Sequence, residues 1–271
     1  MFHRPDGRLT AVLLAALLLT GCGICRADSH EEREPPDPVK DLETVQERGT
    51  LVIGVTEFPP MDTRKDGTWT GFDAELSEAY AESIGVSVEF REIDWDEKTY
   101  LLDDGEIDLI WNGMTGTEEL AQAITCSVPY LSNTQVIVLK DEDAAKYRDV
   151  KACSHLLFSC EEGSAAQSLL SKMRYRLETC NSQQDAVAAV KNGKTDAAVV
   201  DQIMAAYLTG GNSGLCSAYP INEEVLCVGM RKGSSLEASV NAFLQDMSQN
   251  GKLADAAKNY GLSDALLSPD A

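Results

Sequence analysis

The chain has 271 residues, with 23 Lys and Arg against 44 Asp and Glu, and a formal net charge of −21. So acidic a surface argues against nucleic acid or an anionic lipid surface as a partner, because both are themselves negatively charged. The charge favours solubility and does not by itself indicate a function.

The first residues are typical of a secretory signal. Arg4 and Arg8 precede the apolar run 11–19, which is too short to span a bilayer. Because Cys22 directly follows Thr-Gly, residues 1–21 resemble a bacterial lipoprotein signal, with cleavage before Cys22 and lipid on its sulfur. The alternative is an ordinary secretory signal that contains a cysteine.

Residues 22–40 are charged and rich in proline, with almost nothing to bury. This composition predicts a flexible tether. A lipid with more than one acyl chain anchors a protein stably, so we expect the remaining chain to lie outside the cytoplasm, attached to the cell membrane. About 230 residues remain, enough for one large domain or two small ones.

Six cysteines fall in the expected folded part. Outside the cytoplasm an even number permits disulfides, but the sequence does not choose the pairs, and buried free thiols are the alternative. That part has no C-x-x-C pair, and the histidines are few, so we predict no metal or cofactor site. The six cysteines are Cys126, Cys153, Cys160, Cys180, Cys216 and Cys227.

Short apolar, β-branched runs alternate with segments of helical spacing along the folded part. This order predicts βαβ units with parallel strands. The expected strands are 51–56, 86–93, 107–111, 156–160 and 176–180, and the expected helices are 72–84, 96–104 and one from Ser164.

Two stretches share one frame. In LLDDGEIDLIWNG and AAVKNGKTDAAVVD a helix end is followed by Gly, two residues, Asp and an apolar strand, so that Gly105 matches Gly193 and Asp108 matches Asp196. The flanking elements also follow in the same order. We therefore predict two α/β lobes of similar plan rather than a chance coincidence.

Two extended segments without helix signals, 133–140 and 224–233, are interpreted as strands that cross between the lobes. The chain after Lys232 would then return to the first lobe. The predicted limits are 41–134 plus 231–271 for lobe one, and 135–230, with the hinge strands, for lobe two.

Polar and small residues follow the predicted strands. Ligands of open parallel sheets bind beyond the carboxyl ends of the strands, and two lobes joined by two strands can close on a cleft by hinge motion. The candidate ligand-binding residues are Glu57, Phe58, Trp111, Asn112, Gly113, Thr115, Ser164, Ala165 and Asp201.

Each type of candidate has its own chemistry. Gly113 lets a ligand approach the backbone. Thr115 and Ser164 offer hydroxyl and N–H groups to an anion, and Phe58 and Trp111 offer flat aromatic faces.

Each candidate also has a plainer interpretation. Asp201 could pair with an ammonium group or cap the following helix, Trp111 could belong to the core, and Gly113-Met114 could be only a turn. No G-x-S-x-G or P-loop pattern is present, and His155 lies away from the expected cleft. We therefore predict no catalytic residues.

Seven stretches follow one another in a family-specific order: LVIGVTEFPPM, GTWTGFDAELSEAYAESIGVSVEF, IDWDEKTYLLDDGEIDLIWNGMT, SVPYLSNTQVIVL, EEGSAAQSLL, AAVKNGKTDAAVVD and VGMRKGSSLEASVNAFLQDMSQNGKLADAAKNYG. On these stretches the chain resembles the bacterial extracellular solute-binding proteins of family 3, the polar amino-acid receptors of ABC importers. The resemblance implies a periplasmic-binding-protein-like (type II) Venus flytrap, acting as a monomer, that hands an amino acid or related amine to an ABC permease and its ATPase.

The resemblance also implies roles for residues. The ligand α-carboxylate would be held by groups matching Gly113 and Thr115, and the α-ammonium by an acid matching Asp201. An aromatic side chain matching Phe58 would pack on the ligand, and Ser164 matches a further ligand-binding hydroxyl.

The chain departs from the family at Leu120, where an arginine usually binds the ligand carboxylate. Arg64 and Lys65 are expected in a separate loop and Lys98 on another helix, so no basic residue obviously replaces it. Three explanations remain open. Either N–H groups and the helix dipole alone hold the carboxylate, or another residue reaches it, or the ligand is not an ordinary α-amino acid. Several acids near the expected cleft favour a cationic or amine-bearing ligand: Glu57, Glu161, Glu162 and Asp201.

Two other functions fit the same fold. Periplasmic cyclohexadienyl dehydratases are enzymes on a similar scaffold, but such an enzyme must also bind a substrate carboxylate. A sensory or structural lipoprotein would have a cleft that no longer binds a ligand.

Overall fold

A computed structural model describes residues 40–147 and 149–269. The predicted signal, the lipidation of Cys22 and nearly all of the tether lie outside these described residues. Within them, no helix is long and apolar enough to cross a membrane.

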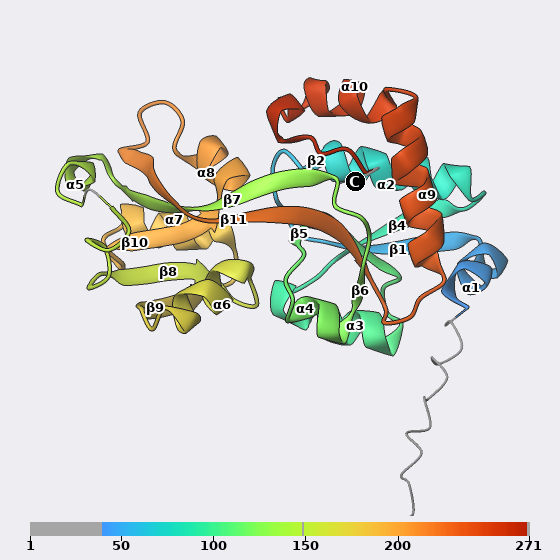
Figure 1. Ribbon diagram of the computed structural model, residues 1–271, viewed down its shortest axis with the longest axis horizontal. Helices are drawn as coiled ribbons and strands as arrows, with labels where there is room; N and C mark the ends of the chain where they lie inside the picture. Colours follow the sequence, from blue (N-terminus) through green and yellow to red (C-terminus); the bar gives the residue numbers. More distant parts are fainter. Residues whose placement is uncertain (1–39, 148, 270–271) are drawn as a thin grey trace, which may run out of the picture. The chain divides into compact units, whose positions relative to one another are not determined.

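Most strands belong to one sheet, which two long antiparallel strands, β7 and β11, run through (Figure 1). On one side β4, β1 and β5 are parallel, and on the other β10, β8 and β9 are parallel. We call the first side lobe one and the second lobe two. In sheet order the strands are β4 (Ser87–Glu92), β1 (Thr50–Val55), β5 (Leu109–Thr115), β11 (Leu215–Met230), β7 (Leu131–Lys140), β10 (Ala197–Asp201), β8 (Leu157–Glu161) and β9 (Arg176–Cys180), with β6 (Thr125–Cys126) pairing with β11.

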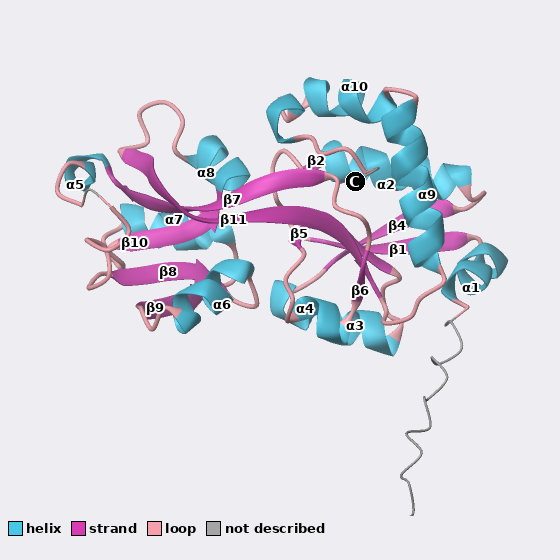
Figure 2. Ribbon diagram, viewed as in Figure 1, coloured by secondary structure: helices cyan, strands magenta, loops and turns pink. Residues whose placement is uncertain are grey.

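Helices follow the parallel strands, as the alternating pattern predicts (Figure 2). In lobe one they are α1 (Asp41–Arg48), α2 (Phe72–Ser83), α3 (Lys98–Asp104) and α4 (Leu120–Ala123), with a 3-10 turn at Trp95–Glu97 and a hairpin of β2 (Thr63–Lys65) and β3 (Thr68–Thr70). The helices between β7 and β11 in the chain are α5 (Asp141–Ala144), α6 (Ala165–Lys172), α7 (Gln183–Lys191) and α8 (Gln202–Leu208). The chain ends in α9 (Leu236–Gln249), α10 (Lys252–Asn259) and a 3-10 turn at Ser263–Ala265.

The last two long helices pack on lobe one. Leu236, Val240 and Leu244 of α9 are fully buried in one apolar cluster with Leu51 of β1 and Tyr80 of α2. The described part of the chain therefore begins and ends in lobe one and forms lobe two between β7 and β11.

The repeated Gly-x-x-Asp frame has the same structure in both lobes. The Asp108 carboxylate accepts a hydrogen bond from the Val52 N–H at 2.7 Å, and the Asp108 N–H donates to the Val52 carbonyl at 2.9 Å. In lobe two, Asp196 makes the same pair of bonds with Leu157, at 2.8 and 2.9 Å. Each Asp thus ties the start of one parallel strand to its neighbour.

Two predicted strands have other limits than the sequence indicates. β5 continues through Asn112-Gly113-Met114 to Thr115, because β11 supplies hydrogen-bond partners there. β11 begins at Leu215, well before the predicted start at residue 224, because it pairs with β7 along that length. The register shift beside Pro220 accommodates a residue that otherwise interrupts a sheet.

All six cysteines of the described part are free thiols. The side chains of Cys126 and Cys227 are neighbours, while Cys153, Cys160 and Cys216 contribute to the apolar core of lobe two. In this structure the cysteines therefore act as buried or half-buried apolar residues.

The two equivalent aspartates differ in burial, which makes them a matched pair. Asp108 is 5% exposed and also binds Arg48, whereas Asp196 is exposed. We expect Asp108→Ala to lower the free energy of unfolding by about 2 kcal/mol, because it leaves the buried Val52 N–H without an acceptor. Asp196→Ala should cost about 0.5–1 kcal/mol, since water can replace the carboxylate. Urea unfolding of both variants measures this, and equal losses would contradict it.

Candidate ligand-binding site

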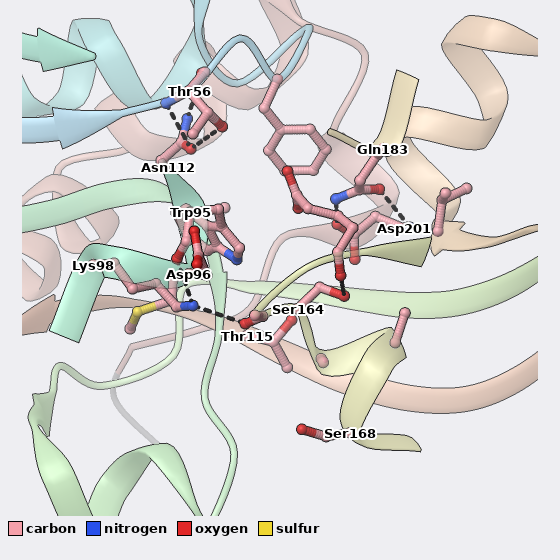
Figure 3. A pocket seen from close by; sticks show the side chains of 18 of the residues that line it. Thr56, Trp95, Asp96, Lys98, Asn112, Thr115, Ser164, Ser168, Gln183 and Asp201 are labelled. Carbon is pink, nitrogen blue, oxygen red and sulfur yellow. Dashed lines mark hydrogen bonds between the residues drawn. The ribbon is translucent and has the colours of Figure 1, made fainter. Parts of the chain in front are cut away.

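A cavity of about 320 Å³ lies between the two lobes (Figure 3). It is formed where the parallel strands end: Thr56–Phe58 after β1, the last residues of β5, Glu161, Gly163 and Ser164 at the end of β8, and Asp201 at the end of β10. This is the edge at which an open parallel sheet binds ligands.

The structure brings eight of the nine candidate residues to this one cavity. They are Glu57, Phe58, Asn112, Gly113, Thr115, Ser164, Ala165 and Asp201. Their contact with a ligand remains a prediction, but they come from both lobes and surround one space.

Trp111 is the exception, and its prediction as a cavity residue is wrong. Its side chain is fully buried and packs against Tyr80 of α2, Phe243 of α9 and Tyr130, with ring centroids 6.0–6.5 Å apart. The pleat of β5 turns this side chain toward the helices of lobe one. Trp111 therefore belongs to the core, the plainer of its two interpretations.

Gly113 accommodates a side chain of the protein itself. It has a φ of 55°, and a Cβ atom at this position would lie 2.2 Å from Cε1 of Phe58. Its N–H donates to the buried carboxylate of Asp73 at 2.6 Å. The Gly113 N–H is thus not free for a ligand carboxylate, while the missing side chain lets Phe58 form part of the cavity wall.

Asn112 has a structural role in the wall. Its amide oxygen accepts from the Thr56 N–H at 3.0 Å and the Thr56 hydroxyl at 2.8 Å, and its nitrogen donates to the Thr56 carbonyl and to Asp62. With these bonds made, Asn112 fixes the end of β1 beside β5 rather than offering polar atoms to a ligand.

A buried acidic network forms the end of the cavity next to the hinge strands. Asp201, only 5% exposed, accepts hydrogen bonds from the amide groups of Asn133, Gln135 and Gln183. The same Asn133 and Gln135 amides donate to Glu224 of β11, at 2.7 and 2.8 Å. Burial and, second, the Glu224 carboxyl raise the pKa of Asp201 well above its ordinary value.

The Asp201 carboxylate bonds to the side chains of this network and not to the helix that follows it. Asp201 precedes α8, but its side chain makes no capping bond there, so the helix-cap interpretation is wrong. The hydroxyl of Thr115 also joins the network by donating to Glu224 at 3.0 Å.

The network lacks donors. Among the described residues, three of its buried acceptor atoms have no hydrogen-bond partner: Oδ1 of Asn133, Oε1 of Gln135 and Oε2 of Glu224. Buried polar atoms are rarely left unpaired. A group with several N–H donors, such as an ammonium, would complete it.

Another part of the cavity wall contains the start of α6. The Ser164 hydroxyl caps this helix by accepting from the Gln167 N–H at 3.2 Å, and it donates to the Glu161 carbonyl at 2.7 Å. Ser164 is thus engaged in the fold. The next N–H groups, of Ala165 and Ala166, have no acceptor within the helix because they begin it, and both residues line the cavity.

Lys98, expected on a helix away from the cleft, also lines the cavity and is 6% exposed. Its ammonium donates to the Trp95 carbonyl at 2.9 Å and, across the cleft, to the Gly163 carbonyl at 2.8 Å. Burial lowers the pKa of Lys98 to about 8, against the opposing effects of Glu161 and Asp96. The position of Lys98 on a predicted helix does not indicate a binding role, because Lys98 meets the wall of lobe two only when the lobes are closed.

Further contacts hold the lobes together. The Gln184 amide of lobe two donates to the Glu57 carbonyl at 2.6 Å, and Lys172 pairs with Glu119 at 2.8 Å. Gly163 lies close to the backbone of Asp96: a Cβ atom added to Gly163 would be only 2.6 Å from the Cα of Asp96. The structure therefore represents the closed state of the cleft.

The contact between Gly113 and Phe58 can be tested against a glycine of similar backbone conformation. Gly214 has a φ of 76° and open space around its Cβ position. Both Gly→Ala changes incur about 1–2 kcal/mol of backbone strain, but only Gly113→Ala also displaces Phe58. We expect a larger loss of thermal stability and a distorted cavity for Gly113→Ala, and equal melting temperatures for the two variants would contradict the contact.

Glu161 should make stability depend on pH. Burial raises the pKa of Glu161 to about 8, so the folded state retains a proton that the unfolded chain releases near pH 4.5. The free energy of unfolding should therefore fall as pH rises between about 4.5 and 8, by up to about 1.4 kcal/mol per pH unit from this group. Glu161→Gln should flatten that slope.

The control for this prediction is Glu162→Gln, one residue along and exposed, which should keep the slope of the unchanged protein. Urea unfolding at a series of pH values measures all three proteins. The same slope in Glu161→Gln as in the unchanged protein would show that Glu161 is ionised in the folded state.

Known proteins similar to this chain include several that are named for amino-acid binding. It is 26% identical to the arginine-binding extracellular protein ArtP of Bacillus subtilis, covering 78% of this chain and 85% of that protein. It is 27% identical to a probable histidine-binding protein of Campylobacter jejuni, over 96% of both chains.

Its structure is similar to that of an ancestral amino-acid-binding protein, AncCDT-1, a precursor of cyclohexadienyl dehydratase. The TM-score is 0.75 and the identity 27%, over 81% of this chain and 98% of the other. This likeness confirms the predicted two-lobe, type II periplasmic-binding-protein fold.

Residues 51–263 match the family model for bacterial extracellular solute-binding proteins, family 3. The matched segment runs from β1 to the last 3-10 turn, and so includes both lobes and every residue that lines the cavity. The chain therefore belongs to the bacterial extracellular solute-binding proteins of family 3.

Proposed function

We propose that this protein is a lipid-anchored receptor outside the cytoplasm that captures an amino acid or related small amine and delivers it to an ABC importer. The observation that carries this proposal is the incomplete acidic network around Asp201. Three buried acceptor atoms of this network lack donors, and Asp201 and Gln135 of the network line the cavity, so an ammonium group bound there would supply donors.

The size of the cavity supports a small solute. About 320 Å³ is at the lower end of the range of ligand pockets, roughly 300–1,000 Å³. A single amino acid fits such a space better than a peptide does. The names of the similar proteins, which bind arginine and in one case probably histidine, point to the same class.

The connection between the lobes supports capture by closure. The chain crosses between them in β7 and β11, and the cavity walls come from both sides. A ligand that touches both walls stabilises the closed state relative to the open one, because it binds the closed state more tightly. Release to a permease would then require the lobes to open.

A panel of amino acids, amines, dicarboxylates and short peptides tests the proposal by thermal shift. We expect amine-bearing solutes to raise the melting temperature of the protein. The best of them should also reduce the radius of gyration in small-angle scattering. Stabilisation by acidic ligands alone would contradict the ammonium site, and turnover of prephenate or arogenate would identify a dehydratase instead.

Asp201→Ala tests the acidic end of the cavity directly. It should abolish both the thermal shift and the compaction, because the ammonium loses the carboxyl group proposed to bind it, while circular dichroism stays that of the folded protein. Asp185→Ala is the matched control, since it removes an exposed carboxylate of the same lobe that does not line the cavity. Normal binding by Asp201→Ala would show that the polarity of the site is wrong.

A further inference from the structure

The cavity has an acidic end, but Leu120 stands where relatives are expected to carry an arginine for the ligand carboxylate. Leu120 itself lines the cavity and is apolar. Among the described residues that line this space, Lys98 is the only one with a basic side chain. The question is whether its ammonium lies where a carboxylate could reach it.

Lys98 projects from the first residue of α3 in lobe one across to lobe two (Figure 3). Its Nζ atom is 2.8 Å from the Gly163 carbonyl, directly before Ser164 and the first turn of α6. Two of its three N–H bonds are directed to the carbonyls of Trp95 and Gly163. The ammonium also lies over the Trp95 ring, with Nζ 4.6 Å from the ring centroid, and its third N–H is donated to neither carbonyl.

The start of α6 adds to the attraction for an anion at this point. The N–H groups of Ala165 and Ala166 lack acceptors within the helix, and a helix N-terminus carries partial positive charge. Both residues line the cavity together with Lys98. A buried cation from one lobe and the start of a helix from the other therefore meet at one end of the space.

Two acids, Glu161 of lobe two and Asp96 of lobe one, favour the charged form of Lys98, but Glu161 compensates that charge incompletely. Burial raises the pKa of the Glu161 carboxyl to about 8, so near neutral pH it is mostly protonated. A buried ammonium without a full counter-charge is unfavourable. A ligand carboxylate would supply that charge.

We propose that Lys98 binds the carboxylate of the captured solute, in place of the arginine that Leu120 replaces. The inference rests on the proposed function and narrows its ligand class to solutes with both a free carboxylate and an amine. Such a solute would place its ammonium toward Asp201 and its carboxylate toward Lys98 and the start of α6.

Pairs of ligands that differ only in the carboxylate test this. Isothermal titration calorimetry would compare L-arginine with agmatine and L-histidine with histamine. A further pair would be the amino acid that raises the melting temperature most in the thermal-shift panel and its own decarboxylated amine. The unchanged protein should bind each amino acid more tightly than its amine, by about 10- to 150-fold, the usual range for a charged hydrogen bond.

Lys98→Met should remove this preference. We expect it to weaken binding of the amino acid by about the same factor and binding of the amine by less than about 3-fold. The reason is that only the amino acid has a carboxylate for the ammonium of Lys98. Lys98→Arg should restore most of the preference. Lys172→Met is the control, since Lys172 also bridges the lobes but is exposed and does not line the cavity.

The outcomes separate this inference from the function on which it rests. If Lys98→Met weakens the amino acid and its amine equally, Lys98 only helps to hold the lobes together and the inference is wrong. The inference is also wrong if Lys98→Met changes neither affinity. If the unchanged protein binds the amines but none of the amino acids, the inference is wrong and the proposed function stands. If it binds neither the amino acids nor the amines, the proposed function fails and the inference with it.

Discussion

The amide side chains of Asn133 and Gln135 hold two carboxyl groups, those of Asp201 and Glu224, at the hinge end of the cleft. A buried carboxylate is unfavourable unless hydrogen bonds and opposite charge compensate it. Here the amides compensate only in part, because acceptors of the network remain without donors. The protein thus maintains a site at which a group with several N–H donors would complete the hydrogen bonds.

The position of this network links recognition to motion. Asn133 and Gln135 lie on β7 and Glu224 on β11, the strands that join the lobes, whereas Asp201 ends β10 of lobe two. The acidic end therefore stays assembled beside the hinge. The contacts of Lys98, Gln184 and Lys172 cross the cleft itself and form only when the lobes approach. A solute bound at both ends favours the closed state over the open one.

Much of the fold could be predicted from the sequence, because it depends on local pattern. The alternation of strands and helices and the repeated aspartates, Asp108 and Asp196, are properties of short segments, and both lobes show the structure they indicate. The convergence of Phe58 and Asp201 on one cavity follows from the rule that parallel strands end at the same edge of a sheet.

The rest depends on contacts between distant segments. Trp111 faces the core because α2 and α9 cover that side of β5, and β11 extends to Leu215 because β7 pairs with it. Lys98 has no local signal of a binding role, since its neighbour Gly163 is far away in the sequence. Asn133 and Gln135 could have been noticed as alternating polar residues in an otherwise apolar strand, which place two amides on one face.

The central claim is that the two lobes enclose a solute whose amine lies at the acidic network beside the hinge. A crystal structure of the protein with the solute that co-purifies with it tests this claim most directly. The account predicts a small amine-bearing molecule enclosed between the lobes, with its nitrogen within hydrogen-bond distance of Asp201. A solute on an outer surface, or one that turns an acidic group toward Asp201, would contradict it.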